Sequence, residues 1–311
     1  AERELFELER DGFERAFVIL HGRGGEDGTV QGALELMGIP YTGSGVRASE
    51  IGMNKALQKE LMAEKGFPTP KIHVIDRDDW TMKTEPVILY RELAAEIGFP
   101  LVIRPANQGS SIGVSIIGKA EGLEGFVQSV NRAFCREVIP ATDWQSRSPF
   151  EKEDYIRFLA DIRDGLGFPV TAQTGETETL IYHPEALLKW LDENLSEEDA
   201  EAATLTAHQS EKQVIVESFI QGKEFSCIVI RKEDGTAVAL PPTEIVKGQE
   251  VFDYRSKYLP GLSRKITPIE LPDQEINAIR SECERLFKEL GFGVYARIDG
   301  FITPEKEIFL N

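Results

Sequence analysis

Four short segments of the chain carry residues of the kinds that bind phosphate and metal ions. The first is the glycine-rich turn HGRGGEDG at residues 21–28, which follows the apolar run at residues 16–20. Glycines let backbone N–H groups approach an anion closely, and the N-terminus of a following helix favours negative charge. The turn matches neither the dinucleotide-binding glycine pattern nor the P-loop. A tight turn between a strand and a helix therefore stays open as the alternative.

The second segment is a loop of small residues that follows Arg104. This arginine stands at the end of an apolar run, and the loop at residues 109–113 has the sequence GSSIG. Backbone N–H groups and the hydroxyls of Ser110 and Ser111 can donate to phosphate oxygens, and Arg104 adds positive charge. An ordinary β-turn is the alternative, but it gives no reason for a cation at the end of the strand.

The third segment ends an apolar strand with an acidic residue. Residues 214–216 are aliphatic, Glu217 follows, and Glu224 comes after the glycine at position 222. Such a strand can bind adenine through main-chain groups and one carboxylate. An amphipathic strand with a glutamate on the surface explains the same residues, and both interpretations stay open.

The fourth segment is Arg297-Ile298-Asp299. Alternate residues of a strand face the same side, so Arg297 and Asp299 are predicted to point together. A cation for a developing oxyanion and a carboxylate for Mg²⁺ suit the chemistry of phosphoryl transfer. An arginine–aspartate pair on the surface is the alternative.

Alternating strands and helices are expected to position these segments. A strand, the glycine turn and a helix ending at Gly38 form a unit typical of a parallel sheet, and the runs at 101–104 and 114–117 predict an antiparallel hairpin. Further strands are expected at residues 71–75, 214–216, 225–231, 244–247, 291–299 and 308–310. Further helices are expected at residues 53–65, 86–97, 123–134, 184–194 and 274–290.

A strongly acidic stretch interrupts this pattern between residues 137 and 212. It holds 17 acidic and 6 basic residues, so its net charge of −11 is most of the −18 of the whole chain. We expect an inserted helical subdomain or a set of surface loops without chemistry of its own. Ser196 is expected to cap the N-terminus of a helix that follows it.

The bulk composition excludes several classes of protein. With 311 residues and 41% hydrophobic residues, the chain can build two or three domains with real cores. Its acidity argues against a nucleic-acid partner and against anionic membranes, and no apolar run is long enough to span a bilayer. Cys135, Cys227 and Cys283 are too far apart for a zinc site or a disulfide framework, so we expect reduced thiols and a cytoplasmic protein.

Taken in order, these motifs resemble the D-alanine–D-alanine ligase family. The resemblance covers the whole chain except the acidic insertion, and its most specific part is the pair of segments at residues 20–32 and 38–45. It continues through MNK at 53–55, RPA at 104–106, GSSIGV at 109–114, VE at 216–217, GKE at 222–224, DY at 253–254, KY at 257–258 and RID at 297–299.

The resemblance implies a fold of the α/β and α+β classes, the ATP-grasp fold. An N-terminal doubly wound α/β domain at residues 1–53 would precede a central lid domain at 54–220, which carries the acidic insertion at about 137–212. A C-terminal catalytic domain would occupy residues 221–311, and the last two domains would sandwich ATP. The family's glycine-rich start and its C-terminal segment lie outside this sequence, and we expect both in the whole protein.

The resemblance also assigns roles around the nucleotide. Lys55 and Arg104 would contact the phosphates of ATP, with Ser110 and Ser111 over them. Glu217 would accept from the adenine amino group. The backbone of Ser218, Phe219 and Ile220 would lie alongside the base, and Glu224 would bind the ribose.

Further roles concern the substrate and the metal. Arg297 would bind the substrate carboxylate and the oxyanion, Lys257 and Tyr258 would lie on a loop that closes over the site, and His21 would lie near the D-alanine pocket. Asp299 would bind Mg²⁺, for which Mn²⁺ is an alternative, and Asn311 stands where the family commonly has a metal-bridging glutamate.

The implied reaction is the ATP-dependent joining of two D-alanines through D-alanyl phosphate, in a cytoplasmic homodimer, for peptidoglycan synthesis. The lysine–tyrosine pair at 257–258 favours D-alanine over D-lactate as the second substrate. Two departures matter, because the family usually has lysine at Arg104 and glutamate at Asn311. They leave a catalytically impaired ATP-binding relative open as one alternative. Another ATP-grasp ligase that joins a carboxylate to an amine is the second, because a fold does not fix its substrate.

Overall fold

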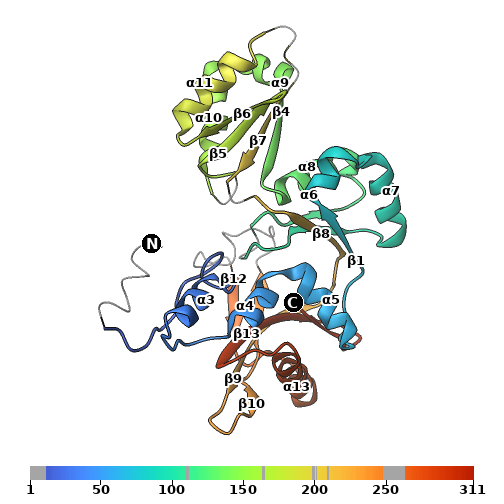
Figure 1. The fold of residues 1–311 in the computed structure, drawn as a ribbon. Helices are drawn as coiled ribbons and strands as arrows, with labels where there is room; N and C mark the ends of the chain where they lie inside the picture. The colour runs from blue at the N-terminus through green and yellow to red at the C-terminus, as the bar shows by residue number, and fades with distance from the viewer. Residues whose placement is uncertain are drawn as a thin grey trace. The chain divides into compact units, whose positions relative to one another are not determined.

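The computed structural model describes residues 12–109, 112–162, 165–197, 200, 202–208, 210–247 and 263–311. The chain forms two compact units (Figure 1). The first unit contains Ala1–Lys71, Ala106–Ser110 and Phe219–Asn311, and the second contains Ile72–Pro105 and Ser111–Ser218. The division into three domains expected from the sequence stays a prediction. Among the described residues, no helix is both long and apolar enough to cross a membrane.

An antiparallel sheet of six strands forms the centre of the first unit. Its strand order is β12-β11-β9-β13-β14, with β10 paired to β9. The strands are β9 (Lys223–Arg231), β10 (Ala237–Ala239), β11 (Thr243–Lys247), β12 (Ser263–Ile266), β13 (Tyr295–Ile302) and β14 (Ile308–Leu310). Helix α13 (Asp273–Glu289) packs its apolar stripe of Ile279, Cys283 and Leu286 into the core beneath this sheet. One face of the sheet is therefore buried, as expected for an amphipathic helix lying on a sheet.

Three short helices precede the sheet in the first unit. They are α3 (Thr29–Leu36), α4 (Val46–Met53) and α5 (Lys55–Glu64). The single helix expected at residues 53–65 is wrong at its start, because Asn54 has an extended backbone and separates α4 from α5. The side-chain Oδ1 of Asn54 accepts from the N–H of Leu57 at 3.1 Å, so this asparagine caps α5.

The strand expected at residues 16–20 is also wrong. Within the described residues it is reduced to a single parallel bridge between Ala16 and Tyr41. Two backbone hydrogen bonds hold this bridge, from Ala16 N–H to the Pro40 carbonyl and from Thr42 N–H to the Ala16 carbonyl. An apolar strand is buried on both faces only where neighbouring strands and helices cover it. Here the described residues cover little of the run, and Phe17 remains 71% exposed.

The second unit begins with a four-stranded antiparallel sheet of order β1-β8-β2-β3. The strands are β1 (Ile72–Asp76), β2 (Leu101–Pro105), β3 (Ser115–Ile117) and β8 (Gln213–Ser218), and the helices are α6 (Arg77–Met82), α7 (Pro86–Glu96) and α8 (Gly122–Ala133). The expected hairpin is confirmed, since β2 and β3 pair antiparallel. One face of the sheet joins a core with residues of α7 and α8, such as Leu93 and Phe126.

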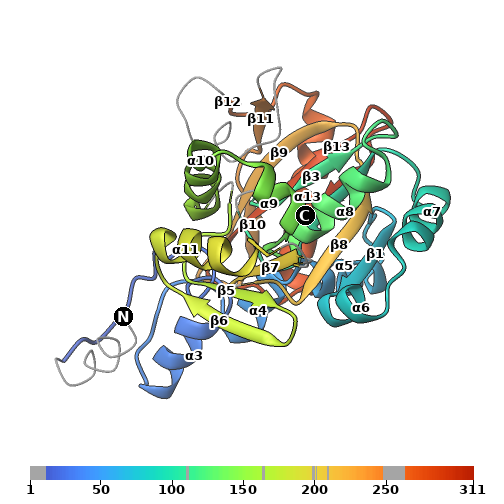
Figure 2. The same ribbon diagram turned by 90° about the horizontal axis from the view of Figure 1, so that it is seen from above.

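The acidic insertion folds around a core of its own. Its antiparallel sheet has the order β4-β7-β5-β6. The strands are β4 (Arg136–Pro140), β5 (Val170–Thr174), β6 (Thr177–Ile181) and β7 (Ala202–Ala207), and the helices are α9 (Ala141–Ser146), α10 (Pro149–Ala160) and α11 (Pro184–Asn194). In the views of Figures 1 and 2, α10 and α11 lie over this sheet. We call residues 136–207 the inserted subdomain.

The expectation of an inserted helical subdomain or a set of surface loops was therefore incomplete. Its strands were missed because their buried positions include alanines, such as Ala203 and Ala172, which give a weak apolar alternation. The expected helix at 184–194 is confirmed as α11. The role expected for Ser196 is wrong, because its hydroxyl donates backwards to the carbonyl of Asp192 and the described residues just after it are not helical.

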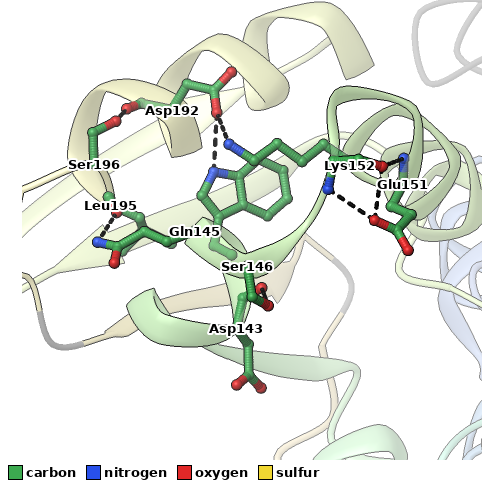
Figure 3. Close-up of polar contacts among 10 residues, drawn as sticks. Asp143, Gln145, Ser146, Glu151, Lys152, Asp192, Leu195 and Ser196 are labelled. Carbon is green, nitrogen blue, oxygen red and sulfur yellow. Dashed lines mark hydrogen bonds and ion pairs between the residues drawn. The ribbon is translucent and has the colours of Figure 1, made fainter.

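A polar cluster ties the helices of the inserted subdomain together (Figure 3). The fully buried indole of Trp144 donates from Nε1 to Oδ1 of Asp192 at 3.1 Å, and Nζ of Lys152 donates to the same oxygen at 2.7 Å. One carboxylate on α11 thus holds residues of both α9 and α10. A capping box between Ser148 and Glu151 starts α10 beside this cluster.

Replacing this carboxylate should loosen the inserted subdomain. We expect Asp192→Ala to cost about 1–3 kcal/mol of local stability, because it leaves the buried indole N–H without its acceptor. Asp192→Asn keeps an acceptor oxygen and should cost less. The measurement is hydrogen exchange of the amides of residues 141–195 by mass spectrometry. Glu193→Ala, at the neighbouring position with an exposed carboxylate, is the control. Equal exchange rates in the Asp192→Ala and Glu193→Ala proteins would contradict the role of Asp192 in holding α9 and α10.

The two glycines of the loop between β2 and β3 differ in what they tolerate. Gly113 has a φ of +69°, and a Cβ atom there would lie 2.9 Å from Cγ of Pro105. A Cβ at Gly109 would meet no atom of the described residues within 4 Å. The conformation of Gly113 therefore requires glycine, whereas that of Gly109 does not.

This difference predicts the outcome of a matched pair of substitutions. Gly113→Ala should lower the thermal midpoint and the free energy of unfolding by about 1–3 kcal/mol, because it adds backbone strain and a contact that is too close. Gly109→Ala should change either quantity little. Thermal and denaturant unfolding, followed by circular dichroism, measure both variants. A tolerated Gly113→Ala beside a destabilising Gly109→Ala would refute this account of the loop.

Candidate functional site

The sheet of the second unit brings Arg104 and Glu217 together. Arg104 on β2 lies opposite Ile215 on β8, and Glu217 lies opposite Val102, so the two side chains are diagonal neighbours on one face. Nε of Arg104 is 3.2 Å from Oε1 of Glu217, and the side chains are 11% and 9% exposed. The sequence assigned these residues to different parts of ATP, the phosphates and the adenine. The structure places them in direct contact.

Lys55 and the loop after β2 also meet, within the first unit. Nζ of Lys55 donates to the carbonyl of Gln108 at 2.7 Å, and the N–H of Lys55 donates to the carbonyl of Ala106 at 2.9 Å. The start of α5 is thus attached to the residues that lead into the serine-containing loop. Ser110 and Ser111 themselves lie outside the described residues.

The open face of the sheet in the first unit carries the other cluster. Arg297 and Asp299 on β13 point together as predicted: Nε and Nη2 of Arg297 each lie 3.3 Å from a carboxylate oxygen of Asp299. Their side chains are 66% and 37% exposed. The N–H of Asn311 donates to the carbonyl of Asp299 at 2.8 Å, which extends the β13–β14 pairing and sets Asn311 opposite Asp299.

Strand β9 adds polar residues to the same face. Asp299 pairs with Ser226, and Phe301 pairs with Glu224, so cross-strand neighbours share the face that points away from α13. Thr243 on β11 pairs with Ser226 from the other side. The sequence singled out Glu224 but missed Ser226 and Thr243. The spacing of two between Glu224 and Ser226 in a recognised strand was the available signal for Ser226.

This face has the donor set expected for magnesium bound together with phosphates. Mg²⁺ usually takes one or two carboxylate ligands from the protein and fills its remaining positions with water and substrate phosphates. Asp299 supplies an accessible carboxylate, and Asn311 supplies an amide oxygen on the neighbouring strand. In the part of the chain that the structure describes, no group of three or more histidine, cysteine or acidic residues is arranged so that it could hold a metal ion. The residues therefore fit a metal that is shared with a nucleotide.

The glycine-rich turn uses its own carboxylates as hydrogen-bond acceptors. The N–H of Gly22 donates to Oε2 of Glu26 at 2.6 Å, and the N–H of Gly24 donates to Oδ2 of Asp27 at 2.8 Å. Partial burial raises the pKa of Asp27, but hydrogen bonds from Gly24 and Thr29 outweigh it and lower that pKa overall. The structure thus favours the tight turn over an anion site. The His21 side chain is 88% exposed, with Nδ1 3.9 Å from Glu26.

The described cysteines do not form a nucleophilic site. All three are free, and Cys227 and Cys283 are buried. A hydrogen bond with Cys227 and burial raise the pKa of Cys283, and burial raises the pKa of Cys135 to about 11. A thiol that stays protonated is a poor nucleophile, which applies to Cys135 and Cys283. The hydrogen bond with Cys283 lowers the pKa of Cys227, but Cys227 is fully buried. The expectation of buried, reduced thiols fits Cys227 and Cys283, whereas Cys135 is only half-buried.

The remaining predicted residues fall into two groups. Lys257 and Tyr258 lie outside the described residues, so the role expected for their loop stays a prediction. Ser218 is the last residue of β8, and Phe219 and Ile220 belong to the link that leads to β9. The nucleotide contacts expected of these three stay predictions as well.

Two family models match the chain. The model described as D-ala D-ala ligase N-terminus matches residues 2–44, and the one described as D-ala D-ala ligase C-terminus matches residues 61–140 and 191–311. Residues 141–190, between the two matched parts, belong to the inserted subdomain. The matched residues make up well over half of the chain.

Named relatives agree with these family models. The D-alanine--D-alanine ligase of Delftia acidovorans is 30% identical over 311 residues, which cover 100% of this chain and 69% of the relative. That of Pelotomaculum thermopropionicum is 29% identical over 303 residues, covering 97% of this chain and 70% of the relative.

A solved structure shows the same fold. The D-alanine-D-alanine ligase from Coxiella burnetii has a TM-score of 0.59 and 20% identity, covering 96% of this chain and 57% of that one. The chain thus spans about 70% of the length of the curated relatives and less of this solved structure. The matched family models, the relatives and the shared fold lead to one conclusion: the chain belongs to the D-alanine–D-alanine ligase family, whose members have the ATP-grasp fold.

Proposed function

We propose that this chain catalyses the ATP-dependent joining of two D-alanine molecules to D-alanyl-D-alanine, a building block of peptidoglycan. The observation that carries the proposal is the cluster of Arg297, Asp299 and Asn311 on one exposed sheet face. A cation, a carboxylate and an amide at neighbouring positions are suited to a carboxylate substrate and a metal–phosphate group. Family membership supplies the identity of the substrates.

In the proposed reaction, the carboxylate of one D-alanine attacks the γ-phosphate of ATP and forms D-alanyl phosphate and ADP. The amine of the second D-alanine then attacks the acyl carbon, loses a proton, and phosphate leaves. Arg297 orients the first carboxylate and stabilises the oxyanion of the second step. Magnesium, with manganese as an alternative, would be held by Asp299 and Asn311 and would neutralise phosphate charge.

Lys55 and the loop after β2 would act on the nucleotide. The hydrogen bond from Lys55 to Gln108 keeps an ammonium group beside the residues that lead to Ser110 and Ser111. We propose that this arrangement brings positive charge and hydroxyl donors to the phosphates. Lys257 and Tyr258 would close over the reacting groups, because water would otherwise hydrolyse the acyl phosphate. His21 would contribute to the D-alanine pocket.

Three further assignments follow from the family and are part of the proposal. The enzyme would work in the cytoplasm, where ATP and D-alanine are available, and it would assemble as a homodimer. The second substrate would be D-alanine, although another ligase on the same fold could use a different amine or hydroxyl group.

Phosphate release measures the proposed activity directly. The protein with ATP and Mg²⁺ should release phosphate when D-alanine is present, and the dipeptide should appear in equal amount. L-alanine and reactions without an amino acid should give only background release. Release with a different amino acid would favour another carboxylate–amine ligase. Nucleotide binding without release would favour the catalytically impaired relative.

Removing the proposed metal ligand should affect the dependence on magnesium. We expect Asp299→Asn to lower kcat by roughly 100-fold or more and to raise the magnesium concentration needed for half-maximal rate. Glu305→Gln makes the same change of charge in the exposed turn between β13 and β14 and should leave both values unchanged. If Asp299→Asn keeps the magnesium dependence of the unchanged protein, Asp299 is not a metal ligand.

A further inference from the structure

The contact between Arg104 and Glu217 is unusual in its surroundings. On the face that the two share, the neighbouring positions of β1, β8, β2 and β3 are aliphatic. They are Ile72, Val74, Ile215, Val102 and Ile116. In an apolar environment opposite charges attract more strongly than in water, and each charge depends on its partner. The pair is therefore built into the sheet and differs from the mobile ion pairs of the surface.

The geometry of the pair also limits what Glu217 can do. Arg104 reaches Oε1 of Glu217 through Nε, at 3.2 Å, from the adjacent strand. Nε is not aligned for a hydrogen bond, so this ion pair holds the carboxylate beside Arg104 through charge and through the near-complete burial of both side chains. Arginine keeps its charge under all ordinary conditions, so Glu217 always has a positive partner beside its Oε1. A lysine at this position would offer a rotatable ammonium group and would fix the carboxylate less well.

We propose that Arg104 is a positioning residue for Glu217 and thereby sets the choice of nucleotide base. The inference rests on the proposed function, in which Glu217 accepts from the 6-amino group of adenine. A fixed carboxylate accepts from that amino group and repels the 6-oxo group of hypoxanthine or guanine, which is itself an acceptor. Arg104 then contributes to base selectivity, in addition to any charge it offers to phosphate.

ATP and inosine triphosphate form a suitable pair of probes, because they share the sugar and the phosphates and differ only at the base edge, in the 6-amino or 6-oxo group and the accompanying proton on N1. The full chain would be titrated with each nucleotide and Mg²⁺ in a calorimeter, without D-alanine. The quantity to compare is the ratio of the two dissociation constants. We expect the unchanged protein to prefer ATP by about tenfold or more, as a hydrogen bond to a charged group would give.

Four variants separate positioning from phosphate binding. Glu217→Gln should abolish most of the preference, because an amide both donates and accepts. Arg104→Met should reduce the preference several-fold, and Arg104→Lys should reduce it less. The double variant Arg104→Met with Glu217→Gln should show the same ratio as Glu217→Gln alone. Arg136→Met is the matched control, since Arg136 is a half-buried arginine of the same unit that contacts neutral partners, and it should leave the ratio unchanged.

The outcomes distinguish this inference from the proposed function. If Arg104→Met weakens ATP and inosine triphosphate equally, Arg104 acts only through the phosphates and the inference is overturned, whereas nucleotide use stands. If the unchanged protein binds neither nucleotide, both are overturned. Loss of one charge from a buried pair can prevent folding. If Arg104→Met does not fold, the test is the ratio of dissociation constants in Glu217→Gln and in the uncharged double variant. Unequal ratios in these two proteins overturn the inference.

Discussion

One layer of helices covers only one face of a sheet, and both polar clusters of this chain lie on the face that the helices of their unit leave uncovered. On β13, Ile298 and Ile302 belong to the core with α13, which leaves Arg297 and Asp299 on the opposite face. Because the side-chain period is two, a slip of one residue would bury Asp299 and expose the isoleucines. The antiparallel register between β9 and β13 thus fixes the cluster more firmly than any contact between its polar side chains.

The two arginine–acid pairs differ in burial, and each degree of burial suits the role proposed for that pair. Arg297 and Asp299 are largely accessible and make long contacts of 3.3 Å, and exposed pairs of this kind contribute only about 0–1 kcal/mol. Arg297 and Asp299 can therefore give up their mutual contact for a substrate or a metal ion at little cost in free energy. Breaking the buried pair of Arg104 and Glu217 by removing one partner would cost about 3–5 kcal/mol. That pair is suited to holding a fixed geometry through the reaction.

Much of the framework around these clusters could be predicted, because it depends on local patterns. The hairpin of β2 and β3, the helix α11 and the joint direction of Arg297 and Asp299 follow from alternation and helical periodicity. The strand expected at residues 16–20 failed, because burial of an apolar run depends on neighbours that its own sequence does not specify. The partner of Arg104 could not be predicted either, since β2 and β8 are more than a hundred residues apart in the sequence.

The inserted subdomain explains how this separation leaves the sheet intact. Its first and last strands, β4 and β7, pair with each other, and the N–H of Ala207 donates to the carbonyl of Cys135 at 3.0 Å. The chain therefore enters and leaves the inserted subdomain at adjacent points, and β8 can still pair with β1 and β2. The core of the subdomain and the core of the β1-β8-β2-β3 sheet are separate clusters of buried residues. An insertion with adjacent ends and an independent core can lengthen a family member without changing the register that sets Glu217 beside Arg104.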